Sequence, residues 1–196
     1  VGDSGVFSFL KSKNENTPVD RITLHVLKSY TKNYKIYNFH EHRGSDERQY
    51  CSPGIDLPVA SLTRTRPGLY PEYHTSGDDL SIVNSKNILG SINLYEKCIN
   101  TFENNHIYKS RIKCEPMMVR RGLYPHLSKK TNDTFNKGEE IKQRGNNTYD
   151  MMTLFHYCDG STDLLSIADK IKKPLLDLVP MVKVLIKNKI IEKVDK

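Results

Sequence analysis

The sequence has 196 residues, of which 37% are hydrophobic and 27% charged, and its formal net charge is +7. Its apolar runs fall far short of the roughly 20 residues that span a bilayer, and no basic-then-apolar signal pattern opens the chain, so we expect a soluble cytoplasmic protein without a membrane segment. The apolar residues cluster in periodic runs, which argues against a wholly disordered chain. Four cysteines lie far apart without a C-x-x-C pair, which favours free thiols over a zinc ribbon or a disulfide framework.

The first forty residues predict a strand, a helix and a second strand. Alternating apolar residues indicate a strand over residues 6–10. A helix follows, because Thr17 can cap it, Pro18 suits its first position, and apolar residues recur at helical spacing as far as Tyr30. An aromatic-rich strand is expected over residues 34–39. This order is the ordinary ingredient of a parallel sheet, so we expect the α/β fold class.

Two irregular, charged loops and a long helix come next. The loops cover residues 43–58 and 64–81, on either side of a short strand predicted over residues 57–63. The loop at 43–58 begins where the second strand ends, which is where open α/β sheets tend to bind ligands. The helix is predicted from apolar residues that step by four and three and should lay one stripe against a core: Ile88, Ile92, Tyr95, Ile99 and Phe102. We expect an extended segment over residues 107–116.

The C-terminal part resembles a winged helix. A polar stretch over residues 126–147 predicts a linker or surface loop. After it, we expect a short helix over 149–158, a second helix capped by Ser161, and a third over 174–188 that ends before a strand at 190–194. Pro180 lies inside the third helix, where an interior proline costs about 3 kcal/mol, so we expect a kink or a later helix start.

Two clusters of polar residues have more than one interpretation. His74 follows Tyr73, and Asp78 lies four residues further on, so the imidazole could face a cleft with a carboxylate to orient it, as metal ligands often have; an ordinary exposed loop histidine is the alternative. The run from Asp46 to Arg48 is either solvated surface or the wall of a cleft. The second interpretation requires Asp46 to be held by neighbouring backbone N–H groups.

Three motifs in order resemble one family. They are "RGSDERQYCSPGIDLPVASL", "GLYPEYHTSGDDL" and "CEPMMVRRGLYP". They are similar to motifs of the zinc aminopeptidase-like family that carries a C-terminal winged helix. Members of this family often occur among polysaccharide-biosynthesis proteins. The family resembles the wider superfamily of co-catalytic zinc aminopeptidases and glutaminyl cyclases. The resemblance implies part of an α/β/α sheet domain over residues 1–125, a polar linker over 126–147 and a winged-helix module over 148–196.

The resemblance also implies roles for individual residues. His74 would be the last zinc ligand of the family's site, and Asp3, in the opening "VGD", would match a strand-end aspartate that binds the second metal. Asp46 and Glu47 would line the cleft, with Glu47 at the position of a histidine in the wider superfamily. The candidates for holding or orienting a substrate are Arg43, Arg48, Tyr73 and Asp78.

The family's upstream motifs "H-P…D-N" and "P-E-T" do not occur in this sequence. The catalytic base and the remaining metal ligands are therefore expected upstream of this chain, whose opening suggests a piece of something longer. We expect the C-terminal part of a zinc metallopeptidase or related hydrolase of peptide-like or amino-acid-derivative substrates, inactive on its own. The alternative is a binding or regulatory protein of polysaccharide biosynthesis that lacks the chemistry.

The winged-helix module raises the separate possibility of a DNA-binding regulator. Its third helix offers only Lys183 and Lys187 against Asp177, and residues 148–196 are close to neutral, whereas a dedicated DNA reader would show a basic stripe. We therefore expect this module to contact protein, with a homo-oligomer as one form, rather than DNA.

Overall fold

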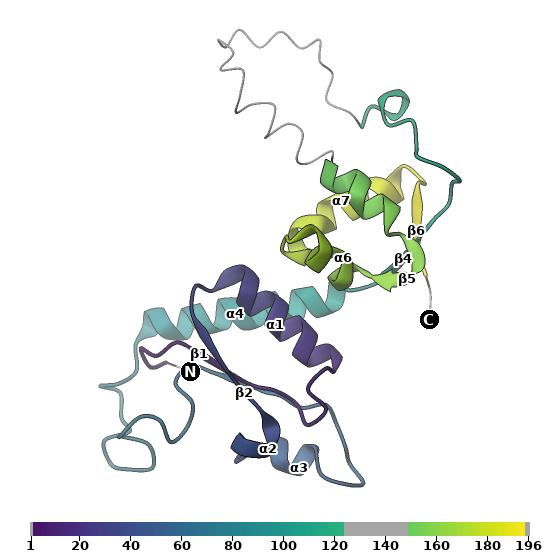
Figure 1. The fold of residues 1–196 in the computed structure, drawn as a ribbon. Helices are drawn as coiled ribbons and strands as arrows, with labels where there is room; N and C mark the ends of the chain where they lie inside the picture. Colours follow the sequence, from purple (N-terminus) through teal and green to yellow (C-terminus); the bar gives the residue numbers. More distant parts are fainter. Residues whose placement is uncertain (1, 124–148, 195–196) are drawn as a thin grey trace, which may run out of the picture. The chain divides into compact units, whose positions relative to one another are not determined.

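The computed structural model describes residues 2–123 and 149–194, which divide into two compact units, Val1–Glu103 and Asn104–Lys196 (Figure 1). Each unit is described separately. Residues 124–148, including the linker predicted over 126–147, lie outside the described residues. Within the described residues, no helix has both the length and the apolar character needed to cross a membrane.

The first unit contains a three-stranded sheet in the order β2-β1-β3. Strand β1 (Phe7–Leu10) pairs in parallel with β2 (Tyr34–Tyr37), as the predicted strand-helix-strand unit requires. Strand β3 (Ser61–Thr63) pairs with the other edge of β1 and runs antiparallel to it. The sheet is therefore mixed, with β1 at its centre.

Helix α1 (Pro18–Tyr30) connects β1 and β2, and helix α4 (Ser85–Asn104) lies beside it on the same side of the sheet (Figure 1). The buried residues of these elements include Phe9 of β1, Leu27 of α1 and Leu94 of α4. Tyr95 fastens α4 to the sheet, because its hydroxyl donates a hydrogen bond of 2.7 Å to the carbonyl of Leu62. The helix predicted from Pro18 is thus confirmed, and its apolar face is core.

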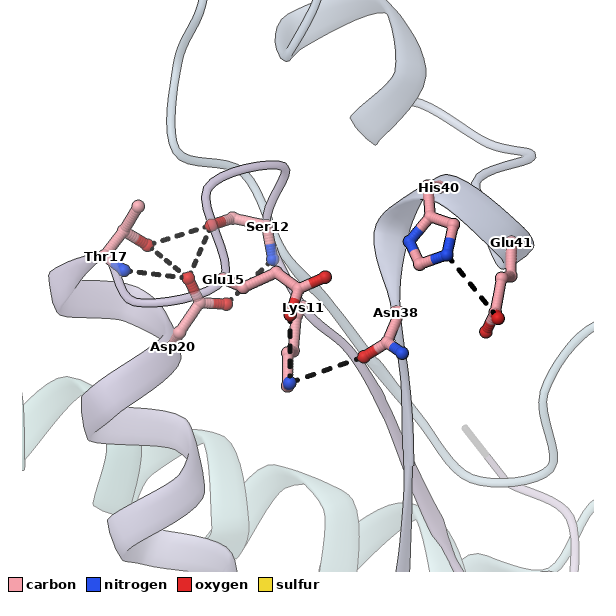
Figure 2. A network of polar contacts seen from close by, with 8 residues as sticks. All are labelled: Lys11, Ser12, Glu15, Thr17, Asp20, Asn38, His40 and Glu41. Carbon is pink, nitrogen blue, oxygen red and sulfur yellow. Dashed lines mark hydrogen bonds and ion pairs between the residues drawn. The ribbon is translucent and has the colours of Figure 1, made fainter.

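The N-terminus of α1 is tied to the end of β1 by a buried carboxylate. Asp20 is fully buried and accepts hydrogen bonds from the backbone N–H of Ser12 at 2.7 Å and the hydroxyl of Ser12 at 2.5 Å. The backbone N–H and the hydroxyl of Thr17 donate to the same carboxylate at 3.0 and 2.6 Å (Figure 2). Four donors satisfy a charge that would otherwise be costly to bury.

The loop predicted over residues 43–58 is partly helical, which corrects the sequence analysis. Helix α2 (Phe39–His42) precedes it, and helix α3 (Glu47–Tyr50) lies within its first half. Both have four residues, which is too short to produce a recognisable apolar period in sequence. The strand predicted over 57–63 is also shorter, because only Ser61–Thr63 pairs with β1.

Four of the five residues of the predicted apolar stripe of α4 are exposed, contrary to our prediction, and only Tyr95 is partly buried, against the sheet. Ile92 is 53% exposed, Ile99 62% and Phe102 57%. The face of α4 that is buried carries Ser91, Leu94 and Thr101 instead. Periodicity correctly indicated the helix, but it could not indicate which of two adjacent faces the described residues would cover.

The second unit has an antiparallel sheet in the order β5-β4-β6. Strand β4 (Ile107–Ser110) lies between β5 (Asp159–Asp163) and β6 (Ile191–Lys193). Around the sheet are helical residues 149–156, helix α6 (Leu164–Ile171) and helix α7 (Leu175–Lys187), and a short 3-10 helix covers Val119–Arg121. Three helices and a small sheet form the winged helix that the sequence predicts.

Two details of the second unit differ from our predictions. Ser161 does not cap α6, because residues 159–163 form β5 and the cap is Asp163, whose carboxylate accepts the backbone N–H of Ser166 at 3.0 Å. Helix α7 begins at Leu175 and continues through Pro180 to Lys187, so the helix does not start later.

Residues 104–123, which we expected in the first domain, belong to the second unit because β4 pairs with both β5 and β6. They add five basic residues and one acidic residue, Glu115, to that unit; the basic residues are Lys109, Arg111, Lys113, Arg120 and Arg121. The near-neutral balance counted for residues 148–196 therefore does not describe the whole unit, whereas the composition of the third helix is unchanged.

Candidate functional site

Asp3 lies just before β1 and is held by the segment that follows β3. Its Oδ1 accepts hydrogen bonds from the backbone N–H of Gly5 at 2.8 Å and from Thr65, through the backbone N–H at 3.1 Å and the hydroxyl at 2.5 Å. Burial alone would raise the pKa of Asp3, but these donors outweigh it and hold the pKa below the ordinary value. Asp3 is therefore a carboxylate fixed at the head of the loop that begins at Arg64.

That loop carries Tyr70, Tyr73, His74 and Asp78. The hydroxyl of Tyr70 donates to Asp78 Oδ2 at 3.3 Å, and the ring of Tyr73 stacks on His74 with 4.0 Å between centroids. Partial burial raises the pKa of Tyr70, and the negative charges of Asp78 and Asp3 raise it further. Asp3 is bound to Thr65, at the start of the loop that carries His74.

His74 is an exposed residue with φ of 61°, in the left-handed region that few residues other than glycine adopt. Asp78, which we predicted to orient the imidazole, instead accepts the hydroxyl of Tyr70. The ring of Tyr73 stacks on the ring of His74.

The donor types of Asp3 and His74 suit zinc, since carboxylate oxygen and imidazole nitrogen are both common ligands. A catalytic zinc site needs about three protein ligands, however, and the part of the chain that the structure describes contains no group of three or more His, Cys, Asp or Glu residues positioned to hold a metal. The described residues therefore do not complete a zinc site by themselves.

Of the two acidic residues Asp46 and Glu47 in the first loop, the one held by backbone N–H groups is not the one that we predicted. We required backbone N–H groups to hold Asp46, but Asp46 is exposed and its side chain makes no capping hydrogen bond. Glu47 is the carboxylate that is held. It is 3% exposed, and its Oε1 accepts the backbone N–H groups of Gly44 at 2.7 Å and Ser45 at 3.0 Å.

Burial by itself would raise the pKa of Glu47, but the backbone donors from Ser45 and Gly44 outweigh burial and lower it. The charge of Arg48 acts in the same direction. Glu47 is therefore a buried side chain that stays ionised at neutral pH. A buried carboxylate held in this state is the feature that most clearly distinguishes this loop from solvated surface.

Glu47 lines a pocket of about 200 Å³ on one face of the first sheet. The floor comes from strand residues that alternate with the buried Phe9: Ser8, Leu10, Tyr37, Ser61 and Thr63. The register places Ser8 opposite Thr63, and Leu10 opposite both Tyr37 and Ser61, so all five belong to the same face. Two segments form the walls. Residues of the segment between β2 and β3, including His42 and Glu47, form one wall, and Arg66, Pro67 and Tyr73 from the loop after β3 form another.

Arg66 is the basic side chain of this pocket, and the sequence analysis missed it. Its guanidinium carbon lies 5.2 Å from the ring centroid of Tyr37, and Nη2 donates to the carbonyl of His42 at 3.3 Å. Arg43 and Arg48, the arginines we predicted, are exposed and do not line the pocket, and Arg43 donates instead to the carbonyl of His40. Tyr73 does line it. Arg66 was not selected because only the sheet register reveals that it faces the loop at 43–58.

Comparisons with known proteins agree with this architecture. Residues 1–105 match a family model described as "Domain of unknown function (DUF4910)", and residues 106–193 match one described as "winged helix-turn-helix". The chain belongs to the DUF4910 family. The boundary between the two matches lies close to the boundary between the two compact units.

One relative of this DUF4910 protein is 34% identical over 171 residues, which are 87% of this chain and 36% of the relative. It comes from Clostridium acetobutylicum and is provisionally named as a polysaccharide biosynthesis protein with an aminopeptidase-like domain. A crystal structure of a protein from the same organism, provisionally named as a peptidase, has 30% identity and a TM-score of 0.82 over 99% of this chain and 40% of that protein. These findings confirm the aminopeptidase-like resemblance with its C-terminal winged helix. The chain spans less than half the length of either relative.

Proposed function

We propose that this DUF4910 chain is part of a cytoplasmic, zinc-dependent aminopeptidase-like hydrolase, to which it contributes Asp3 and His74 as metal ligands. The arrangement that supports this best is the attachment of Asp3 to the His74 loop. Asp3 accepts two hydrogen bonds from Thr65 at the start of that loop, nine residues before His74. Zinc in such a site polarises a carbonyl and activates water.

The remaining ligands and the catalytic base would come from residues outside this chain. The described residues lack a group of three potential ligands, and the named relative extends well beyond the matched part. The substrate would be peptide-like or an amino-acid derivative. In this arrangement, the chain's own residues hold Asp3 in its ionised form through Thr65 and Gly5 and restrict the ring of His74 by stacking on Tyr73.

The exposed stripe of α4 supports one part of the proposal, that this chain is part of a longer protein. From Ile88 to Phe102 it extends over about 21 Å of helix, and a contiguous apolar surface of this kind is rare on a complete soluble domain. We assign its cover to further residues of the same polypeptide, because the matched parts of the two relatives are only 36% and 40% of their lengths. A helix packed on Ile92, Ile99 and Phe102 would complete the layer that α1 and α4 begin.

The test uses the complete gene product that carries this sequence. Its zinc content, measured by elemental analysis, should be stoichiometric, and it should hydrolyse amino-acid p-nitroanilides. His74→Ala should weaken zinc binding by more than about a hundredfold, since even changes next to a ligand cost 10- to 100-fold. The matched control is His40→Ala, which removes another exposed histidine of the first unit and should leave the zinc content unchanged.

Two results would contradict the proposal. Retention of zinc by His74→Ala would remove His74 from the site. Absence of both zinc and hydrolysis from the unchanged protein would favour the alternative, a binding protein that keeps the fold without the chemistry.

A further inference from the structure

The pocket on the first sheet combines two opposite charges on a small polar surface. Glu47 supplies a carboxylate that is 3% exposed, and Arg66 supplies a guanidinium held over the ring of Tyr37. Among the described residues, Glu47 and Arg66 do not form an ion pair with each other. Glu47 accepts hydrogen bonds from Gly44 and Ser45, and Arg66 donates to the carbonyl of His42. Each charge therefore retains capacity for a ligand.

The geometry of the holding contacts leaves that capacity available. The backbone N–H groups of Gly44 and Ser45 bind one oxygen of Glu47, Oε1, and the backbone N–H of Glu47 itself also interacts with the carboxylate, which has about four acceptor positions over two oxygens. Arg66 uses one of its donors on His42, out of the five that a guanidinium carries. The backbone contacts fix both charges in place without neutralising either.

The volume restricts the ligand. About 200 Å³ is less than the 300–1,000 Å³ of sites for drug-sized molecules and suits a single small metabolite. Ser8, Ser61 and Thr63 on the floor provide hydroxyl groups, and Leu10 and Tyr37 provide apolar surface. A peptide longer than one or two residues could enter only in part.

We propose that this pocket binds a free α-amino acid, with its ammonium group at Glu47 and its carboxylate at Arg66. A compact zwitterion satisfies both charges at once, whereas a neutral sugar would leave two charged groups without partners. This inference rests on the proposed function and extends it, because the bound amino acid would be the product that peptide hydrolysis releases. Hydrolysis of an amino-terminal peptide bond breaks the C–N bond: the oxygen of water goes to the carbonyl carbon, which becomes the carboxylate of the released amino acid, and a proton goes to the nitrogen, which becomes the new amino terminus of the shortened peptide.

The experiment measures binding to this 196-residue chain, without hydrolysis. Saturation-transfer NMR with a mixture of the proteinogenic L-amino acids selects the ligand, and calorimetry measures its affinity in the presence of EDTA. Derivatives of the selected amino acid that are acetylated on nitrogen or amidated on the carboxyl group, each lacking one charge, should bind at least about tenfold more weakly, as expected for the loss of a hydrogen bond to a charged group.

Glu47→Gln and Arg66→Gln should each weaken binding at least about tenfold. Glu47→Gln keeps an oxygen that can accept the Gly44 and Ser45 N–H groups, so the loop should persist. Matched controls are Glu115→Gln and Arg120→Gln, exposed residues of the second unit with the same charge changes, which should leave the affinity unchanged. A circular dichroism melting curve for each variant separates lost binding from lost folding.

Binding of no amino acid, or equal binding of the charged and derivatised forms, would overturn the proposal, and so would preferential binding of a neutral monosaccharide. Failure of the zinc hypothesis is distinguishable, because EDTA removes the metal from this assay. An amino acid that still binds under these conditions supports the pocket whether or not the complete protein hydrolyses peptides.

Discussion

Asp20 joins the start of α1 to the end of β1 through Ser12, whose backbone N–H and hydroxyl both donate to its carboxylate. Ser12 and Asp20 are eight residues apart in sequence, and Asp20 is fully buried. This contact ties the first turn of α1 to the segment that follows β1, the strand whose residues Ser8 and Leu10 line the pocket.

Replacing Asp20 should destabilise the first unit strongly. Asp20→Ala leaves the donors of Ser12 and Thr17 without their acceptor, which should lower the free energy of unfolding by about 2–4 kcal/mol. Urea denaturation followed by circular dichroism measures the change. The control is Glu15→Gln in the same loop, a partly exposed side chain paired with Lys11, which should change stability by less than about 0.5 kcal/mol. Equal effects of both substitutions would show that the network does not hold α1 in place.

The stability that Glu47 contributes should depend on pH. Its pKa in the folded protein lies below the ordinary value of 4.5, so the ionised form is favoured by folding. This contribution is present above the unfolded pKa and is lost as pH falls through the folded pKa. The urea midpoint of the unchanged chain should therefore exceed that of Glu47→Gln at neutral pH, and the difference should shrink below about pH 4.5. A difference that grows on acidification would reverse the assigned direction.

The stripe of α4 predicts opposite results in two contexts. In this chain, Ile99→Lys with Phe102→Lys should reduce self-association in analytical ultracentrifugation and change stability little, because both side chains are more than half exposed. In the complete gene product, the same double substitution should cost about 2–4 kcal/mol, as expected for charges placed in a core. Leu94→Ala, on the buried face of α4, is the control and should cost about 2–4 kcal/mol in both contexts. Unchanged stability of the complete protein would mean that nothing covers the stripe.

The cysteines should differ in reactivity. Burial raises the pKa of Cys98 to about 11 and that of Cys158 to about 12, so both stay protonated and slow to react. Cys51 is buried and donates to the carbonyl of Leu57, whereas Cys114 is exposed. A thiol reagent at about pH 8 should modify Cys114 first, and Cys114→Ser should abolish the fast phase. A fast phase that survives this substitution would show that one of the buried thiols is accessible.

Capping residues and apolar spacing in the sequence were sufficient to predict the elements that short stretches of sequence determine. Pro18 and the apolar spacing after it predicted α1, and alternation predicted β1. Strand β5 was missed because its sequence, Asp-Gly-Ser-Thr-Asp, is polar throughout. It is a strand because β4 pairs with it, and Asp159 turns the chain by accepting the backbone N–H groups of Ser161 and Thr162.

The site could be predicted only to the level of the loops that form it. The motifs indicated the segments around Asp46 and His74, but the difference between Asp46 and Glu47 depends on burial, and the position of Arg66 depends on the pairing of β3 with β1. Both are tertiary properties that neighbouring residues do not encode. The same holds for the apolar stripe of α4. Its helical spacing can be read from neighbouring residues, but the residues that would cover it are distant in sequence.

The most direct test is anomalous diffraction at the zinc edge from crystals of the complete gene product. The account predicts a peak bonded to a ring nitrogen of His74, with a carboxylate oxygen of Asp3 bonded to the same ion or its neighbour, at distances of about 2.0–2.2 Å. A zinc peak bonded to neither residue would contradict it.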